Sequence, residues 1–302
     1  MRSEYIHGWR FALALGLFCA TANAGNILFT FGGSGLGGPQ ANLNSMNPPS
    51  AATVTDVNPL VGDGNTSFDG GLVFANNLLY GIGNDGGLFS TLYSFDLNGN
   101  NVTAVSTDFN TTGQAQSFIF QNGLASDGTN FYAIGVSTLT GAEDLFQIGD
   151  GNATLLRSLP TFGGTYAGMA WDAALAQFYA LLVNGTGDQA GDRVVHFGLS
   201  TGWASNVELT HLDGAQVGSH LDGLADTGTG ILYDIYMNQN TNTGQLEEID
   251  LRSTPTVTTL YDTAIQGSQT AGIAIVTPEP ATTIAIGAGL CVLASMLKRR
   301  MK

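Results

Sequence analysis

Short runs of apolar residues, bounded by glycine, asparagine or aspartate, recur along the chain at a regular spacing. Five of them begin with glycine followed by two apolar or small residues, and successive starts lie 45 to 55 residues apart: Gly71-Leu72-Val73, Gly123-Leu124-Ala125, Gly168-Met169-Ala170, Gly223-Leu224-Ala225 and Gly272-Ile273-Ala274. After each of the first four come a second run containing a tyrosine, a third apolar run, a turn and a fourth, β-branched run. Short runs bounded by turn residues are typical of strands. Four strands in a unit of this length are typical of a β-propeller blade.

The two ends of the repeat region carry complementary partial units. Leu28-Phe29-Thr30-Phe31 matches the third strand of a unit and Ala52-Thr53-Val54-Thr55 the fourth, whereas Gly272 to Val276 matches a first strand with nothing after it. Joining them would remove the open edges that a linear array exposes. The pattern therefore predicts an all-β, five-bladed β-propeller over residues 25–276, with N- and C-terminal strands in one blade. A β-sandwich built from the same strands is the alternative.

Composition limits the partners of this body. The chain has 42 glycines, 11% charged residues and a net charge of −15, and between residues 25 and 280 its only cationic side chains are Arg157, Arg193 and Arg252. Such a surface repels nucleic-acid phosphates and anionic lipid head groups, but it is compatible with divalent cations or neutral glycans. The two cysteines, Cys19 and Cys291, lie near the ends, so the body can form neither a disulfide nor a thiolate metal site.

The N-terminus has the pattern of a secretory leader. Arg2 and Arg10 precede an apolar run from Phe11 to Ala20, which is too short to span a bilayer. Ala22 and Ala24 then form a small-x-small cleavage site, so residues 1–24 are predicted to be a signal peptide cut after Ala24. The expected partners at this stage are the Sec machinery and signal peptidase.

The C-terminus has a proline-flanked motif, an apolar segment and a basic tail in that order. Pro278-Glu279-Pro280 precedes 17 residues without charge, 281–297, and the chain ends in Lys298, Arg299, Arg300 and Lys302. As a helix, 17 residues are just long enough to cross a thin hydrocarbon core. The basic tail would stay on the cytoplasmic side, which places the body outside the inner membrane.

This C-terminal arrangement resembles the PEP-CTERM sorting signal of Gram-negative bacteria, and the resemblance covers residues 277–302. It implies a membrane-anchored intermediate that exosortase processes near Pro278-Glu279-Pro280, and then a place at the cell surface or in the extracellular matrix and biofilm, in contact with extracellular polysaccharide. The prolines keep the segment extended and accessible at the membrane face. A permanent anchor is the alternative. The body resembles propeller-like modules of exported bacterial proteins, a similarity that implies architecture without activity.

Candidate binding residues are few. His211, Asp213, His220 and Asp222 could hold a transition metal, because imidazoles and carboxylates recur within twelve residues. Asp69 and Asp222 precede first strands, so they are expected near the mouth of the central channel and are candidate ligand residues. Asp63 to Asp69 alternates like a calcium loop, but Phe68 replaces the necessary glycine. No cofactor is expected, with Ca²⁺ or another divalent metal as the possible exception. The repeated tyrosines are interpreted as blade packing: Tyr80, Tyr132, Tyr179 and Tyr233.

Motifs of common enzymes are absent from the sequence. The chain contains no GxSxG, no HExxH and no phosphate-loop lysine. Gly33, Gly35 and Gly38 spell GxGxxG, but Pro39 and the asparagine-rich run after it exclude the helix that a dinucleotide site needs, so this segment is interpreted as a loop. The favoured hypothesis is an exported binding or scaffold protein. The alternative is a hydrolase or lyase that uses acidic residues, with or without a metal, at the channel mouth.

Overall fold

The computed structural model describes residues 27–276 apart from 34–39, 47–54, 62–65, 86–88, 122, 161–163, 184–192, 200–202, 209, 212–218, 221–222, 239–242 and 267–271. The signal peptide, the sorting motif, the predicted membrane segment and the basic tail all lie outside the described residues. Within them, no helix is both long and apolar enough to cross a membrane.

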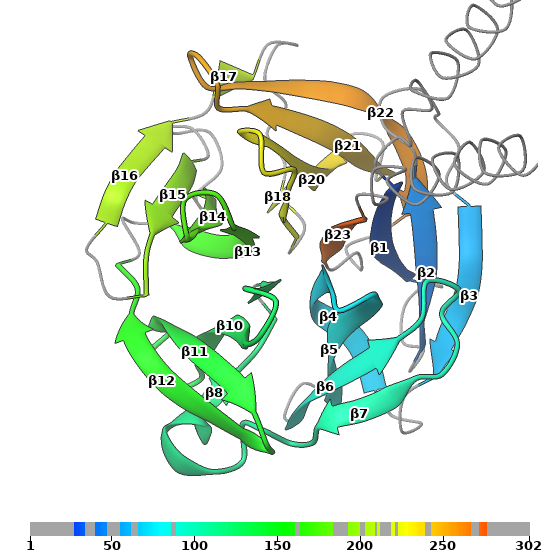
Figure 1. The fold of residues 1–302 in the computed structure, drawn as a ribbon, viewed down its shortest axis with the longest axis vertical. Coiled ribbons are helices and arrows are strands. Elements are labelled where there is room, and N and C mark those ends of the chain that lie inside the picture. The colour runs from blue at the N-terminus through cyan, green and yellow to red at the C-terminus, as the bar shows by residue number, and fades with distance from the viewer. Residues whose placement is uncertain are drawn as a thin grey trace, which may run out of the picture. The chain divides into compact units, whose positions relative to one another are not determined.

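Five sheets, antiparallel except for one short parallel pair at the edge of the fifth, surround a central axis, as Figure 1 shows, and we number these blades from the N-terminus. Blade 1 contains β1 (Ile27–Gly33), β2 (Gln40–Met46), β3 (Thr55–Val61) and β23 (Ile273–Val276). Blade 2 contains β4 (Thr66–Ala75), β5 (Leu78–Asp85), β6 (Phe89–Phe95) and β7 (Thr103–Ser106). Blade 3 contains β8 (Phe118–Ile119), β9 (Leu124–Ser126), β10 (Phe131–Ser137), β11 (Glu143–Gly149) and β12 (Asn152–Ser158).

The remaining strands form two further blades. Blade 4 contains β13 (Thr165–Asp172), β14 (Gln177–Val183), β15 (Arg193–Phe197) and β16 (Trp203–Glu208). Blade 5 contains β17 (Thr210–His211), β18 (Ser219–His220), β19 (Ala225–Asp226), β20 (Ile231–Asn238), β21 (Thr243–Asp250) and β22 (Thr256–Gln266). A single 3-10 turn, η1 (Gly113–Ala115), is the only helix among the described residues. The predicted five-bladed propeller is therefore confirmed.

The ring closes through blade 1. Strand β23 pairs antiparallel with β1, with Thr30 opposite Ile273 and Leu28 opposite Ile275. The Thr30 hydroxyl also donates to the carbonyl oxygen of Gly272 at 2.8 Å, although the two residues are 242 positions apart in sequence. The prediction that the two ends share one blade is confirmed.

The strand assignment within that blade needs a correction. The order is β23-β1-β2-β3, so the run from Leu28 is the second strand rather than the third, and β2 fills the position between it and β3. Strand β2 lies in the segment interpreted from sequence as a loop. Its asparagines have low strand propensity, but pairing with β1 and β3 and burial of Leu43 and Met46 hold it in the sheet.

The hydrophobic core is divided among the joints between blades. Alternate residues of a strand point to opposite faces, so each blade packs against both of its neighbours. Strand β20 illustrates this, because Leu232 packs in the joint with blade 4 while Tyr233 and Ile235 pack in the joint with blade 1. The repeated tyrosines are buried in these joints, which supports their interpretation as packing residues.

Candidate functional site

The five repeat glycines meet where the innermost strands come closest to the axis. A side-chain carbon added to each of them would collide with the backbone of the next blade: Gly71 against Gly123, Gly123 against Gly168, Gly168 against Gly223, Gly223 against Gly272, and Gly272 against Gly71. The circuit is closed, so the glycines form a ring of touching backbones. We call it the glycine ring. Because no side chain fits between these backbones, each repeat unit carries a glycine at this position.

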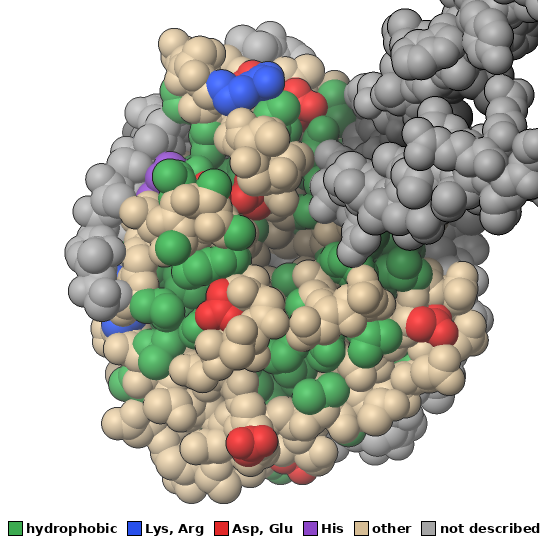
Figure 2. Space-filling view, in the orientation of Figure 1, with side chains coloured by type: hydrophobic (Ala, Val, Ile, Leu, Met, Phe, Trp, Pro, Cys, Tyr) green, Lys and Arg blue, Asp and Glu red, His purple; other side chains and the backbone are tan. Residues whose placement is uncertain are grey.

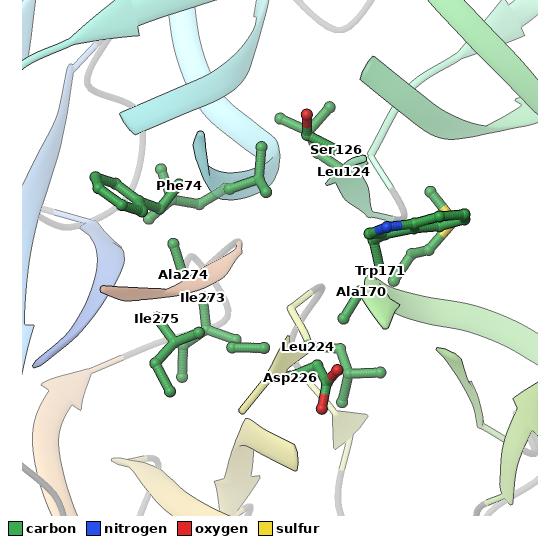
Figure 3. Close-up of a pocket in the computed structure, with 14 residues that line it drawn as sticks. Phe74, Leu124, Ser126, Ala170, Trp171, Leu224, Asp226, Ile273, Ala274 and Ile275 are labelled. Carbon is green, nitrogen blue, oxygen red and sulfur yellow. The ribbon is translucent and has the colours of Figure 1, made fainter. Parts of the chain in front are cut away.

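A cavity of about 100 Å³ lies along the axis beside this ring, and the residues that follow each glycine line it. Its walls are made of the first three positions after each glycine, without Ala125 of blade 3 (Figure 3): Leu72, Val73, Phe74, Leu124, Ser126, Met169, Ala170, Trp171, Leu224, Ala225, Asp226, Ile273, Ala274 and Ile275. All of these residues but two carry apolar side chains, yet backbone atoms together with Ser126 and Asp226 make the accessible surface of the cavity more polar than apolar.

The third position after each glycine is the most varied. It holds Phe74 in blade 2, Ser126 in blade 3, Trp171 in blade 4, Asp226 in blade 5 and Ile275 in blade 1. In Figure 3 these side chains surround the central space, with the Asp226 carboxylate and the Trp171 indole on adjoining walls. Asp226 is thus the one charged side chain among the described residues that line the cavity.

Asp226 is held at the joint between blades 4 and 5. Its Oδ1 accepts a hydrogen bond from the backbone N–H of Gly228 at 3.0 Å. Burial and, less strongly, the Asp172 carboxylate together raise the pKa of Asp226 to about 6, against the lowering effect of the Gly228 and Thr227 N–H groups. The carboxylate consequently titrates close to neutral pH.

Asp172 lies behind Asp226 and does not line the cavity. It is 5% exposed, and its Oδ1 accepts hydrogen bonds from the N–H groups of Ala174 at 2.8 Å and Leu175 at 3.1 Å. Burial, together with the charge of Asp172 and a hydrogen bond to it, raises the pKa of the Tyr179 hydroxyl. Asp172 therefore positions Tyr179 and acts electrostatically on Asp226.

A histidine completes the environment of this joint. The His196 ring meets the Tyr179 ring edge-on, with centroids 4.2 Å apart. Burial lowers the pKa of His196, while the Asp172 charge opposes that shift. Since His196 is neutral at pH 7, it does not neutralise the two carboxylates.

The structure separates the two histidines that the sequence suggested as metal ligands. His211 lies in β17, opposite Val257 of β22, whereas His220 lies in β18, opposite Tyr236 of β20. Strands β22, β21 and β20 lie between them in the sheet, so the two residues occupy opposite edges of blade 5. Asp213 and Asp222 fall outside the described residues. No group of three His, Cys, Asp or Glu side chains within the described ranges is arranged to hold a metal ion.

Of the predicted channel-mouth residues, Asp222 lies outside the described residues. Asp69 precedes Gly71 along β4, whereas the cavity is lined by residues that follow the glycines. Sequence reasoning missed Asp226. One feature of the sequence could have indicated it: Asp226 is the only charged residue at the third position after a repeat glycine, where the other four units carry Phe, Ser, Trp and Ile.

No model of a protein family matches the chain, and no curated protein matches it. Among solved structures, an α-L-arabinofuranosidase from Clostridium thermocellum superposes with a TM-score of 0.51 at 14% identity, over 83% of this chain and 94% of that one. TolB from Acinetobacter baumannii gives a TM-score of 0.44 at 13% identity, over 87% and 69% of the two chains. A chain of a nidogen/laminin complex gives 0.44 at 13%, over 84% and 99%. At such identities the likeness to the first of these structures supports the propeller fold and nothing further.

Proposed function

We propose that this chain is an exported bacterial protein, sorted at the inner membrane by exosortase, whose propeller serves as a binding module or scaffold at the cell surface or in the extracellular matrix. The observation that carries the proposal is the C-terminal order of Pro278-Glu279-Pro280, an uncharged segment and a basic tail, paired with an N-terminal leader. The expected partners are signal peptidase, exosortase and extracellular polysaccharide.

The position of the last strand is compatible with such processing. Strand β23 ends at Val276, two residues before Pro278. Cleavage near the tripeptide would therefore remove the membrane segment and leave every described strand of the propeller in place.

The cavity favours binding over hydrolysis by paired carboxylates. Glycoside hydrolysis of that kind requires two carboxyl groups that both reach the substrate. Asp226 lines the cavity, but Asp172 is buried behind it with its Oδ1 occupied by two backbone N–H groups. A hydrolase or lyase remains the second candidate, because one carboxyl group with a raised pKa stands on the cavity wall.

The proposal is tested by expressing the full chain in a Gram-negative host with and without an exosortase. The mature product should begin at Gly25 and lack the residues after the tripeptide when exosortase is present, and it should stay membrane-bound when exosortase is absent. Intact-mass measurement of each cell fraction distinguishes these forms. A full-length product in the cytosol with both terminal segments uncut would refute the proposal.

A further inference from the structure

The cavity carries a negative charge that the described cationic side chains do not balance. Arg252 forms an ion pair with Asp250 at 2.7 Å, and Arg157 donates to the carbonyl oxygen of Gly198 at 3.1 Å. Neither these two nor Arg193 lines the cavity. On the face shown in Figure 2, apolar side chains gather around the centre, and Lys and Arg side chains appear only near the edge. A ligand with a positive charge and an apolar part would complement such a site.

The repeat supplies an internal comparison for the position of Asp226. In the joint between blades 3 and 4, the Tyr132 hydroxyl donates to Asp127 at 2.8 Å, and the Trp171 ring lies parallel to the Tyr132 ring, with centroids 6.5 Å apart. In the joint between blades 4 and 5, Asp172 and Tyr179 are the repeat equivalents of Asp127 and Tyr132. The position equivalent to Trp171, however, holds Asp226.

Blades 1, 2 and 4 fill this position with an apolar side chain, and in blade 3 the neutral Ser126 accepts from the Gly128 N–H as Asp226 accepts from the Gly228 N–H, so neither packing nor turn closure requires a charge. A carboxylate placed there beside a second carboxylate carries an electrostatic penalty. Groups held in unfavourable electrostatic surroundings within a cavity are often functional.

We propose that the cavity binds a small alkylammonium ligand, whose ammonium group pairs with Asp226 and whose alkyl chain lies against the half-buried Phe74, Trp171 and Ile275. This inference rests on the proposed role of the propeller as a binding module and names the class of its ligand. The cavity has room for about three water molecules at liquid density, which suits a short alkyl chain. The first residues after the glycines, by contrast, are buried in the joints between blades: Leu72, Leu124, Met169, Leu224 and Ile273.

The aromatic residues on the cavity wall favour the same ligand. Trp171 and Phe74 are third-position residues like Asp226. The Trp171 ring is held in place by stacking on Tyr132 and by edge contact with Phe178, so it gives the alkyl chain a fixed apolar wall. A neutral sugar could stack on Trp171, but it would leave the Asp226 charge without a counter-charge.

The test uses the full chain in a non-ionic detergent, with n-butylammonium as the probe and n-butanol as its neutral match in size. Isothermal titration calorimetry at pH 7.5 should show millimolar or tighter binding of butylammonium and at least about tenfold weaker binding of butanol, the ratio expected for a hydrogen bond to a charged group. Equal affinity for the two probes, or no binding of butylammonium, would overturn the proposal.

Two variants locate the binding to the cavity. Asp226→Asn should weaken butylammonium binding about tenfold or more, whereas Asp150→Asn removes one charge from an exposed turn with positive φ and should change nothing. Unchanged binding by Asp226→Asn would show that the cation binds elsewhere and would overturn the proposal.

The wild-type chain gives a further measurement that needs no variant. The groups that face Asp226 are Asp172 and Tyr179, with His196 against the Tyr179 ring. Because the pKa of Asp226 is about 6 and an alkylammonium keeps its proton throughout, affinity should fall as the pH drops from 7.5 to 5. An affinity for butylammonium that does not change between pH 7.5 and pH 5 would contradict the assignment of Asp226 as the residue that pairs with the ammonium group. Localisation and processing are measured separately by mass, so failure here leaves the proposed export and sorting intact.

Discussion

At the residue scale, the molecule departs from its own repeat at Asp226. The equivalent positions pack a ring, an aliphatic chain or a hydroxyl, and each suits a half-buried wall. Asp226 instead puts a carboxylate within reach of the charge of Asp172, and the raised pKa of Asp226 expresses both its burial and this repulsion. The arrangement favours a protonated Asp226 or a bound cation. Above neutral pH it therefore lowers the stability of the folded, ligand-free protein.

The stability of the ligand-free protein should reveal this penalty. The folded-state pKa of Asp226 is about 6, above the unfolded value of about 3.9, so the folded state binds more protons between these values and stability falls as the pH rises through that window. Asp226→Asn should therefore raise the free energy of unfolding at pH 7.5 by about 1 kcal/mol, after allowance for solvent screening. The gain should vanish at pH 4. Urea denaturation at both pH values measures it, and an equal effect at both would contradict the explanation.

At the scale of elements, the glycine ring determines how closely the innermost strands approach. The positive φ values of Gly71, Gly123 and Gly272, 105°, 129° and 76°, also favour glycine at those positions. At Gly223, by contrast, the limit is space, because an added side-chain carbon would lie 2.6 Å from the backbone nitrogen of Ile273.

Gly223→Ala should therefore destabilise the propeller through contact between blades. The added methyl group must displace backbone rather than a flexible side chain, so we expect a loss of about 2 to 3 kcal/mol in the free energy of unfolding. Gly149→Ala is the matched control, since a side-chain carbon there meets no atom within 4 Å. Thermal or urea unfolding of the two variants measures the difference. Equal stability of the two would show that the blades adjust without strain.

The repeat made most of the fold predictable, because glycine, tyrosine and β-branched runs recur at fixed places in each unit. Strand β2 was missed because asparagine-rich residues such as Asn42 and Asn44 resemble a loop, and only long-range pairing with β1 and β3 makes them a strand. The ring closure could be inferred, since the partial units at the two ends are complementary, but the register that places Thr30 opposite Ile273 is seen only in the structure.

The site was less predictable for a physical reason. Sequence shows which residues line the innermost strands, but it does not show on which side of the glycines a cavity lies, so the sequence pattern did not single out Asp226. The two His-Leu-Asp-Gly copies looked like one cluster because they are close in sequence. Between His211 and His220, however, the chain passes from the outer edge of blade 5 to its inner edge.

At the scale of the whole molecule, one short strand completes the ring. Strand β23 has four residues, of which Ile273, Ala274 and Val276 are buried. It joins two of the hydrophobic clusters between blades, since Ile273 packs with blade 5 while Ala274 and Val276 pack with blades 1 and 2. Its hydrogen bonds to β1 also remove the exposed edge that would otherwise invite association with other chains.

The proposed maturation therefore has to spare β23, and truncation tests whether this strand is needed. A chain ending at residue 276 keeps every described strand and should unfold cooperatively, like the complete chain. A chain ending at residue 271 loses burial of Ile273 and Val276, each of which contributes about 1.5 to 3 kcal/mol. Their sum of about 3 to 6 kcal/mol reaches the lower end of the net stability of an ordinary domain, about 5 to 15 kcal/mol. We expect the shorter chain to lose its near-UV circular dichroism and its cooperative transition and to associate through the open edge of β1. If the two truncated chains unfolded alike, closure by β23 would not be what holds the propeller together.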